Sequence, residues 1–344
     1  MAAASPPETV APAASPTVIL RDFAGWCARN PAAVLLVAGI LAALVYFFGF
    51  HEVFTNGTRS TAHWAWEAWN PENNQEHSVL ILPIALFLLW YHRDKLAAAR
   101  KEPSLAGLAI VLIGACAFVL AARALQPRLA IVALPILIYG SVLYLWGRQV
   151  ARVFLFPCAF LLFMVPIGGL VQGTVSLQLL VSNVVNVMAG WIGVKIEASG
   201  TTIRSLDGSF NFEIAEGCSG VRSLMAMTTL TALYAHFTQT VLWKKVALFS
   251  GSVAFAVVGN IGRIFTVILV AKFYDPKFAS GLYHDYSGFV FFPIAVVAMV
   301  SFGNLLNTTW RSLYEKYYLG EKGMALEAAR AAEGKTPAPI SYDY

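Results

Sequence analysis

Long apolar runs, most of them close to the length of a membrane-spanning helix, recur along most of the chain. A helix needs about 20 apolar residues to cross the hydrocarbon core of a bilayer. We predict spans at 31–50, 78–91, 105–122, 129–146, 153–172, 219–237, 246–270 and 289–310. The second span is short and can extend back into the tryptophan-rich segment that precedes it, because Trp favours the membrane interface. The pattern therefore predicts an all-α integral membrane protein with about eight transmembrane helices.

Two stretches depart from this pattern. The segment 175–194 is apolar, but polar side chains recur in it at helical spacing and suggest one polar face, at Gln178, Ser182, Asn183 and Asn186. We interpret it as an interfacial or partly buried helix rather than a full span. The segment 195–217 alternates polar and apolar residues around Asp207-Gly208, a dipeptide that is typical of hairpin turns. We therefore expect a small β-hairpin directly before Cys218.

The composition excludes a single soluble core. Hydrophobic residues make up 58% of the 344 residues and charged residues only 12%, whereas about 25% of an ordinary soluble chain is charged. The mean hydropathy is +0.64. The net charge of +5 is modest, and the basic residues cluster in short loops between spans. We therefore expect membrane lipids as partners and no nucleic acid.

The basic loops also predict an orientation, because Lys and Arg are enriched on the cytoplasmic side of membrane proteins. Five basic regions fall on one side of the predicted layout, namely Arg21/Arg29, the loop 93–101, Arg148/Arg152, Lys244/Lys245 and Arg311/Lys316. Arg123 and Arg128 fall on the other side and count against the prediction. The hairpin, Cys218 and the loop 272–288 then face outward from the cytoplasmic (inner) membrane.

The predicted membrane domain covers 31–310, between two cytoplasmic segments at 1–30 and 311–344. Residues 1–17 are rich in Ala, Pro and Ser and are expected to be disordered. Arg21 and Arg29 follow this tail and directly precede the first apolar run, so we expect that run to be a retained anchor rather than a cleavable signal.

Cys218 is the one cysteine of four with polar neighbours, in the sequence EGCSGVRSL at the predicted start of a span. The thiolate is the reactive form of cysteine, and a helix N-terminus favours it. Arg222 lies one helical turn later and could lower the thiol pKa or bind a substrate carbonyl or carboxylate. Gly217 and Gly220 leave backbone accessible. The alternative is a small residue packed at a helix start.

Arg263 lies inside an otherwise uncharged apolar run, in the sequence GNIGRIF, with Asn260 on the same helical face. A charge within a span costs roughly 2.5–3.5 kcal/mol on insertion scales, so it usually faces a cavity or a partner. The alternative is an arginine whose charged end reaches the interface.

His284 lies in the sequence LYHDYSGF, in the predicted outer loop before the last span. Histidine exchanges protons near neutral pH. A single histidine in a loop is usually only a surface residue. His284 is a candidate because it is predicted to lie at the same face of the membrane as Cys218 and Arg263. His63, His77 and nearby acids match no strong metal motif, so we expect no metal and no cofactor.

The motifs Cys218-Ser219-Gly220 and Asn260-x-x-Arg263, followed by His284 before a terminal span, resemble those of the exosortase/archaeosortase family. The stretch 77–96 is also similar to an early family segment. The resemblance covers roughly 31–310. It implies a membrane-embedded cysteine transpeptidase or protease that processes exported proteins carrying a C-terminal signal, which consists of a short motif, a transmembrane helix and a basic tail.

The resemblance implies that Cys218, Arg263 and His284 form the catalytic set. Our hypothesis is that Cys218 is the nucleophile, His284 the general base and acid, and Arg263 the stabiliser of the oxyanion, with Ser219, Gly220, Arg222 and Asn260 in support. The partners would be C-terminally tagged substrate proteins and an acceptor, either water or an amine, for example on a glycolipid. Two alternatives stay open: a transporter of polysaccharide or lipid-linked intermediates, and a non-catalytic assembly factor for exopolysaccharide export.

Overall fold

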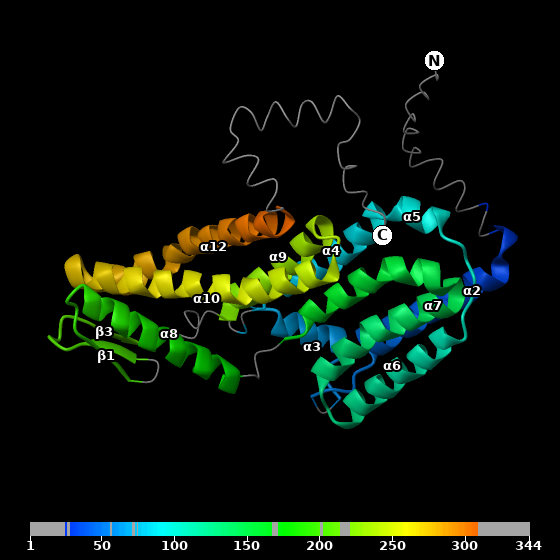
Figure 1. The fold of residues 1–344 in the computed structure, drawn as a ribbon. Coiled ribbons are helices and arrows are strands. Elements are labelled where there is room, and N and C mark those ends of the chain that lie inside the picture. The colour runs from blue at the N-terminus through cyan, green and yellow to red at the C-terminus, as the bar shows by residue number, and fades with distance from the viewer. Residues whose placement is uncertain are drawn as a thin grey trace, which may run out of the picture.

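The computed structural model describes residues 25, 28–55, 57–70, 73, 75–166, 171–199, 202–213 and 221–308. Helices dominate this part of the chain, and a small sheet lies at one end of the molecule (Figure 1). The elements in chain order are α2 Pro31–Leu44, η1 Val45–Phe50, α3 Thr61–Ala68, α4 Ser78–Tyr91, α5 Arg93–Ala98, α6 Ala106–Arg123, α7 Pro127–Phe160, η2 Leu161–Met164, α8 Val171–Trp191, β1 Ile196–Ser199, β2 Thr202–Ser205, β3 Asn211–Glu213, α9 Val221–Thr238, α10 Leu242–Phe273, α11 Pro276–Phe278, η4 Ala279–Tyr283 and α12 His284–Asn307.

Within the described residues, five helices are long and apolar enough to cross a membrane. They are Pro31–Phe50, Ala106–Arg123, Pro127–Met164, Leu242–Phe273 and Tyr286–Asn307. Helix α4 is apolar but has only 14 residues. The structure therefore describes a mostly helical multi-pass membrane protein, and it does not confirm the predicted number of eight spans. Apart from residues 25 and 28–30, the predicted terminal segments 1–30 and 311–344 lie outside the described residues.

The longest of these five helices folds back on itself at Gly147. Its backbone there has φ 80° and ψ −171°, a conformation that is open almost only to glycine. The guanidinium Nε of Arg128 donates a 2.9 Å hydrogen bond to the carbonyl of Pro166, which a straight helix would hold about 57 Å away. The bend therefore separates two antiparallel halves, as the separate predicted spans 129–146 and 153–172 require.

The sheet has three antiparallel strands in the order β1-β2-β3, one more than the expected hairpin. Asp207-Gly208 lies in the turn between β2 and β3, and Gly208 has φ +74°. The carboxylate of Asp207 accepts hydrogen bonds from the Ser205 hydroxyl and the Ser209 amide, and from the ammonium of Lys272 at the end of α10. The turn is thus tied to the last turn of a long helix.

Helix α8 packs against this end of α10, and the sheet joins the same hydrophobic core. Val181, Val185 and Ala189 of α8 are buried in this core. Gln178 and Ser182 are buried as well, while Asn183 is exposed. The prediction of a partly buried helix agrees with this packing, and the predicted polar positions are divided between the core, which contains Gln178 and Ser182, and the surface, which contains Asn183.

Helix α10 has 32 residues and is about 48 Å long, which exceeds a hydrocarbon core of about 30 Å. Arg263 lies 21 residues after Leu242, or about 30 Å along the helix. The apolar residues that follow it, including Ile264, Val267 and Ile268, pack against α8 and the sheet. The run beyond Arg263 is therefore covered by protein.

Helix α12 lies antiparallel to α10 along most of its length. Ser287 contacts Arg263 at one end, and Asn307 accepts a hydrogen bond from Lys244 at the other. Between them, a Cβ added at Gly259 would lie 3.3 Å from the Cβ of Ala295. The two helices therefore approach closely and hold a fixed register.

Candidate functional site

The guanidinium of Arg263 joins α10 to the first turn of α12. Its Nε donates a 2.9 Å hydrogen bond to the hydroxyl of Ser287, and one of its terminal nitrogens donates a 2.9 Å bond to the backbone carbonyl of His284. A guanidinium has five N–H donors in one plane, and these two bonds use two of them. The two bonds fix the plane of the guanidinium and leave donors for a third group.

The hydroxyl of Ser287 both accepts and donates in this arrangement. It accepts from Arg263 and donates a 2.8 Å bond to the carbonyl of His284, and the side chain is buried. Sequence reasoning missed Ser287. Its spacing of three residues from His284 would have placed the two on one helical face, but only if α12 had been expected to begin that early.

His284 is the first residue of α12 rather than a loop residue. The predicted outer loop 272–288 is wrong in this respect. Helix α10 continues to Phe273, the short α11 and η4 follow, and the chain enters α12 directly. Asp275 begins this connection by accepting a hydrogen bond from the Phe278 amide, which is the capping geometry of a helix start. His284 is therefore held by helical backbone next to Arg263.

A small cavity lies beside the Arg263 guanidinium, between α9, α10 and α12. Its volume is about 10 Å³, which is close to the space that one water molecule occupies. The lining residues are Ser223 and Met227 of α9, Ala256, Gly259, Asn260 and Arg263 of α10, and Gly288, Phe291, Phe292 and Ala295 of α12. The three helices that carry or follow the predicted site residues therefore meet at one place.

The predicted nucleophile Cys218, with Ser219 and Gly220, lies outside the described residues. The structure resumes at Val221, where α9 begins. Ser223 lies five positions after Cys218 and lines the cavity beside Arg263. Sequence reasoning also missed Ser223, since it interpreted the stretch after Cys218 only as the start of a span.

The structure brings Asn260 to the cavity, where its side chain is buried. The Nε of Arg222 lies 3.1 Å from a carboxylate oxygen of Glu76, and both side chains are about half exposed. Arg222 does not line the cavity. The structure therefore links α9 to the segment before α4 through this ion pair, which the sequence did not suggest.

The acids and histidines near α3 form an ion-pair cluster. The Nε of Arg59 donates a 2.8 Å hydrogen bond to Glu67, and His63 lies 3.4 Å from the other oxygen of that carboxylate. The hydrogen bond from Arg59 lowers the pKa of Glu67. Burial lowers the pKa of His77. Among the residues that the structure describes, no three His, Cys, Asp or Glu side chains come together as a metal site.

The comparisons with known proteins agree with the membrane architecture. Residues 66–301 match the model of a protein family described as transmembrane exosortase. This range includes the elements from α4 to η4 and most of α12, and therefore all the residues that line the cavity. No curated protein and no solved structure matches the chain. Because the family model covers well over half of the sequence, the chain belongs to the transmembrane exosortase family.

Proposed function

We propose that this protein is a membrane cysteine transpeptidase or protease that cleaves C-terminal sorting signals of exported proteins. One observation carries the proposal: Arg263 bonds to the first turn of α12, and it lines a single cavity together with the first turns of α9 and the following turns of α12. Cys218 precedes α9 by three residues, and three residues of chain reach at most about 11 Å. We therefore propose that the Cys218 thiol lies close to this cavity, because Ser223 in the same stretch of chain lines it.

In the proposed reaction Cys218 is the nucleophile and His284 takes its proton. The thiolate sulfur attacks the scissile carbonyl carbon and forms a tetrahedral intermediate whose oxygen carries the negative charge. This intermediate collapses, the C–N bond breaks, and the imidazolium returns the proton to the leaving amine. Water or an acceptor amine then attacks the thioester and releases the sulfur, with the imidazole acting first as base and then as acid.

Arg263 supplies N–H donors to the oxyanion in this proposal. Fixed donors stabilise charge that develops in the transition state because they need no reorganisation when the reaction occurs. The bonds to Ser287 and to the His284 carbonyl provide this fixation, since they hold two edges of the planar group. Asn260 lies three residues before Arg263 on the same cavity wall and is proposed to contribute to its polar lining.

The proposed substrates carry a short motif, a transmembrane helix and a basic tail. The helix of such a signal fits an enzyme buried in the bilayer, and the basic tail stays in the cytoplasm by the same charge rule that orients the enzyme. Cleavage then occurs at the outer face of the cytoplasmic membrane. The predicted orientation places both ends of the described chain, near Asn30 and Thr308, on the cytoplasmic side.

Co-expression with a candidate substrate from the same genome tests the proposal. We expect wild type to shorten the substrate and the Cys218→Ala variant to leave it at full length while still inserting into the membrane. Cys158→Ala is the matched control, because that thiol is buried away from this site in the second half of α7. Substrate processing by Cys218→Ala at the wild-type rate would remove the thiol from the mechanism and favour a non-enzymatic role.

A further inference from the structure

An apolar groove lies in the part of the molecule formed by α2, α6 and α7. Its volume is about 560 Å³, which falls within the range of about 300–1,000 Å³ that ligand pockets have. Its walls are largely aliphatic and aromatic side chains, including Leu44, Phe48, Val111 and Phe118. All three helices are long apolar helices of the kind that span membranes, so the groove opens among lipid chains.

The groove exists because α2 packs loosely. None of the residues in Pro31–Leu44 is buried, whereas α6 and α7 pack closely on each other. The close packing of α6 on α7 leaves a continuous apolar surface beside α2. A lipid acyl chain can fill the space along that surface and gain van der Waals contacts that the protein itself does not make there.

One end of the groove is polar and positively charged. His51 directly follows the last residue of η1, and Arg123 is the last residue of α6, so both line the groove at the same end. The Arg123 side chain is exposed, and no ion pair or hydrogen bond joins it to another residue that the structure describes. A guanidinium at the mouth of an apolar groove provides charge complementarity to an anion that carries a hydrocarbon chain.

Arg123 is also one of two residues that contradict the expected orientation. The structure accounts for the other, because Arg128 donates to the Pro166 carbonyl and its guanidinium lies 5.7 Å from the centre of the Trp64 ring. Arg123 has no such role among the residues that the structure describes. A ligand with negative charge at this face of the membrane would explain why a basic residue lies there.

We propose that the groove binds a phospholipid with a net negative headgroup. Its acyl chain lies along α2, α6 and α7, and its phosphate accepts hydrogen bonds from the Arg123 guanidinium and an N–H of His51. Lipid is the occupant because the groove runs between bilayer-spanning helices and its charge is confined to one end, which matches the chemistry of a headgroup and a chain. This site is separate from the cavity at Arg263 and does not depend on the proposed reaction.

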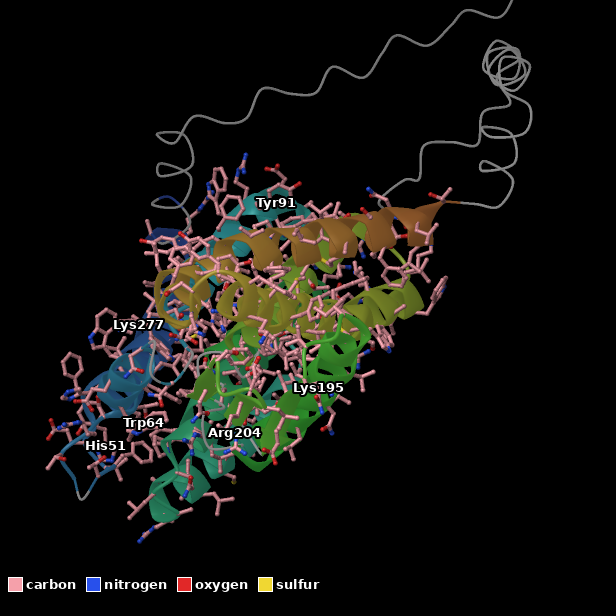
Figure 2. All side chains as sticks on the ribbon, turned by 90° about the vertical axis from the view of Figure 1, so that its left-hand side faces the viewer. His51, Trp64, Tyr91, Lys195, Arg204 and Lys277 are labelled. Atoms are coloured by element: carbon pink, nitrogen blue, oxygen red, sulfur yellow. The ribbon has the colours of Figure 1, made fainter. Side chains whose placement is uncertain are left out.

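The figures place the two regions apart. In Figure 1, α2 and α6 lie at the opposite side of the molecule from the sheet, α8 and the end of α10. In Figure 2, His51 and Trp64 lie on the blue N-terminal elements, to one side of Arg204 and Lys195, which belong to the sheet region. Binding of lipid can therefore be measured without reference to substrate processing.

Photocross-linking tests the proposal on the full-length protein in nanodiscs of phosphatidylcholine. The probes are photoactivatable phosphatidylglycerol and photoactivatable phosphatidylcholine, and mass spectrometry locates the labelled peptides. We expect phosphatidylglycerol to label the peptides of α2 and α6 severalfold more than phosphatidylcholine does. An excess of inorganic phosphate should reduce this labelling only weakly, because the chain contributes to binding.

Two variants and their controls make the test specific. Arg123→Gln should remove most of the preference for phosphatidylglycerol, whereas Arg100→Gln, an exposed arginine outside the groove, should retain it. Ala115→Phe should reduce labelling by both probes, whereas Leu112→Phe on the exposed side of α6 should not. If Ala115→Phe does not fold, the Arg123→Gln and Arg100→Gln pair decides alone.

Three results would overturn the proposal. They are equal labelling by the two lipids, an unchanged preference in Arg123→Gln, and complete competition by inorganic phosphate. The first two would mean that only ordinary boundary lipid fills the groove, and the third would mean that the site recognises a free anion.

Discussion

The guanidinium Nε of Arg263 donates a 2.9 Å hydrogen bond to the Ser287 hydroxyl, which itself donates to the carbonyl of His284. This chain of bonds couples the middle of a long helix to the first turn of another. The hydroxyl has no reactive role in the proposed chemistry. The hydroxyl instead orients the Arg263 guanidinium, so the plane of that group depends on where α12 begins.

Ser287→Ala should therefore slow processing without abolishing it. The variant removes the acceptor of the Arg263 Nε and leaves the His284 carbonyl as the other fixed partner. A hydrogen bond to a charged group is worth about 1.5–3 kcal/mol, so we expect a loss of about 10-fold or more in the cleavage rate. Ser280→Ala removes a similar hydroxyl that bonds only backbone carbonyls at Pro276 and Lys277 and should leave the rate unchanged. Equal rates for the two variants would show that Ser287 does not position Arg263.

Arg263→Lys should cost about 100- to 1,000-fold in rate, the usual loss for one oxyanion donor. A lysine keeps the positive charge but lacks the planar fork that bonds Ser287 and the His284 carbonyl together. The rate of substrate cleavage under single-turnover conditions is the measurement. Arg204→Lys, in an exposed pair with Glu197 on the sheet, is the control and should be neutral. Undiminished cleavage by Arg263→Lys would contradict the oxyanion role.

Gly147→Ala should destabilise the fold strongly. The added Cβ would lie 1.8 Å from the Glu102 carbonyl oxygen, and the residue has φ +80°. Backbone strain and steric overlap of this kind cost about 3 kcal/mol. Thermal unfolding in detergent measures the effect. Gly39→Ala on α2 is the matched control, because a Cβ there meets nothing within 4 Å. A midpoint for Gly147→Ala equal to that of Gly39→Ala would contradict the fold at the bend.

Asp207→Asn should loosen the turn between β2 and β3. Hydrogen bonds from Lys272 and Ser205 hold the pKa of this carboxyl far below its ordinary value of 3.8. A carboxyl with a depressed folded pKa stabilises the folded state fully above its unfolded pKa, and the contribution declines as the pH falls below it. Amide exchange of 202–213 should thus be faster in Asp207→Asn than in wild type at neutral pH, and the difference should shrink below pH 3.8.

Glu197→Gln, whose partner Arg204 lies within the sheet, should show no comparable change at the turn. A difference between Asp207→Asn and wild type that does not vary with pH would contradict the role of the ion pair.

The sequence predicted most of the helices well, because a helix that crosses a membrane needs a long run of apolar residues and such runs are visible in the sequence. The predicted run 105–122 and helix α6 differ by one residue at each end, and the predicted 78–91 coincides with α4. The same signal did not show what covers each apolar surface. The predicted run 246–270 lies within a helix long enough to cross a membrane, but Val267 and Ile268 in it face α8 and the sheet.

The candidate site was predictable in its residue types but not in its contacts. The isolated charge of Arg263 in an apolar run indicated a cavity or a partner, and the structure shows both. Ser287 and Ser223 carried no signal, because a serine in a helix is ordinary and its role depends on tertiary contacts. The ion pair of Arg222 with Glu76 joins residues 146 positions apart, and no local pattern predicts such a pair.

The most direct test of the account measures whether Cys218 lies next to the first turn of α12. In a protein without the other cysteines, His284→Cys and Leu305→Cys each add one thiol to the same helix, at its opposite ends. A short ethylene-bridged bis-methanethiosulfonate should link Cys218 to the thiol at position 284 within minutes, and it should leave the thiol at position 305 unlinked. If a maleimide labels both thiols of the His284→Cys protein and the bridge still does not form, the convergence of thiol, guanidinium and imidazole is contradicted.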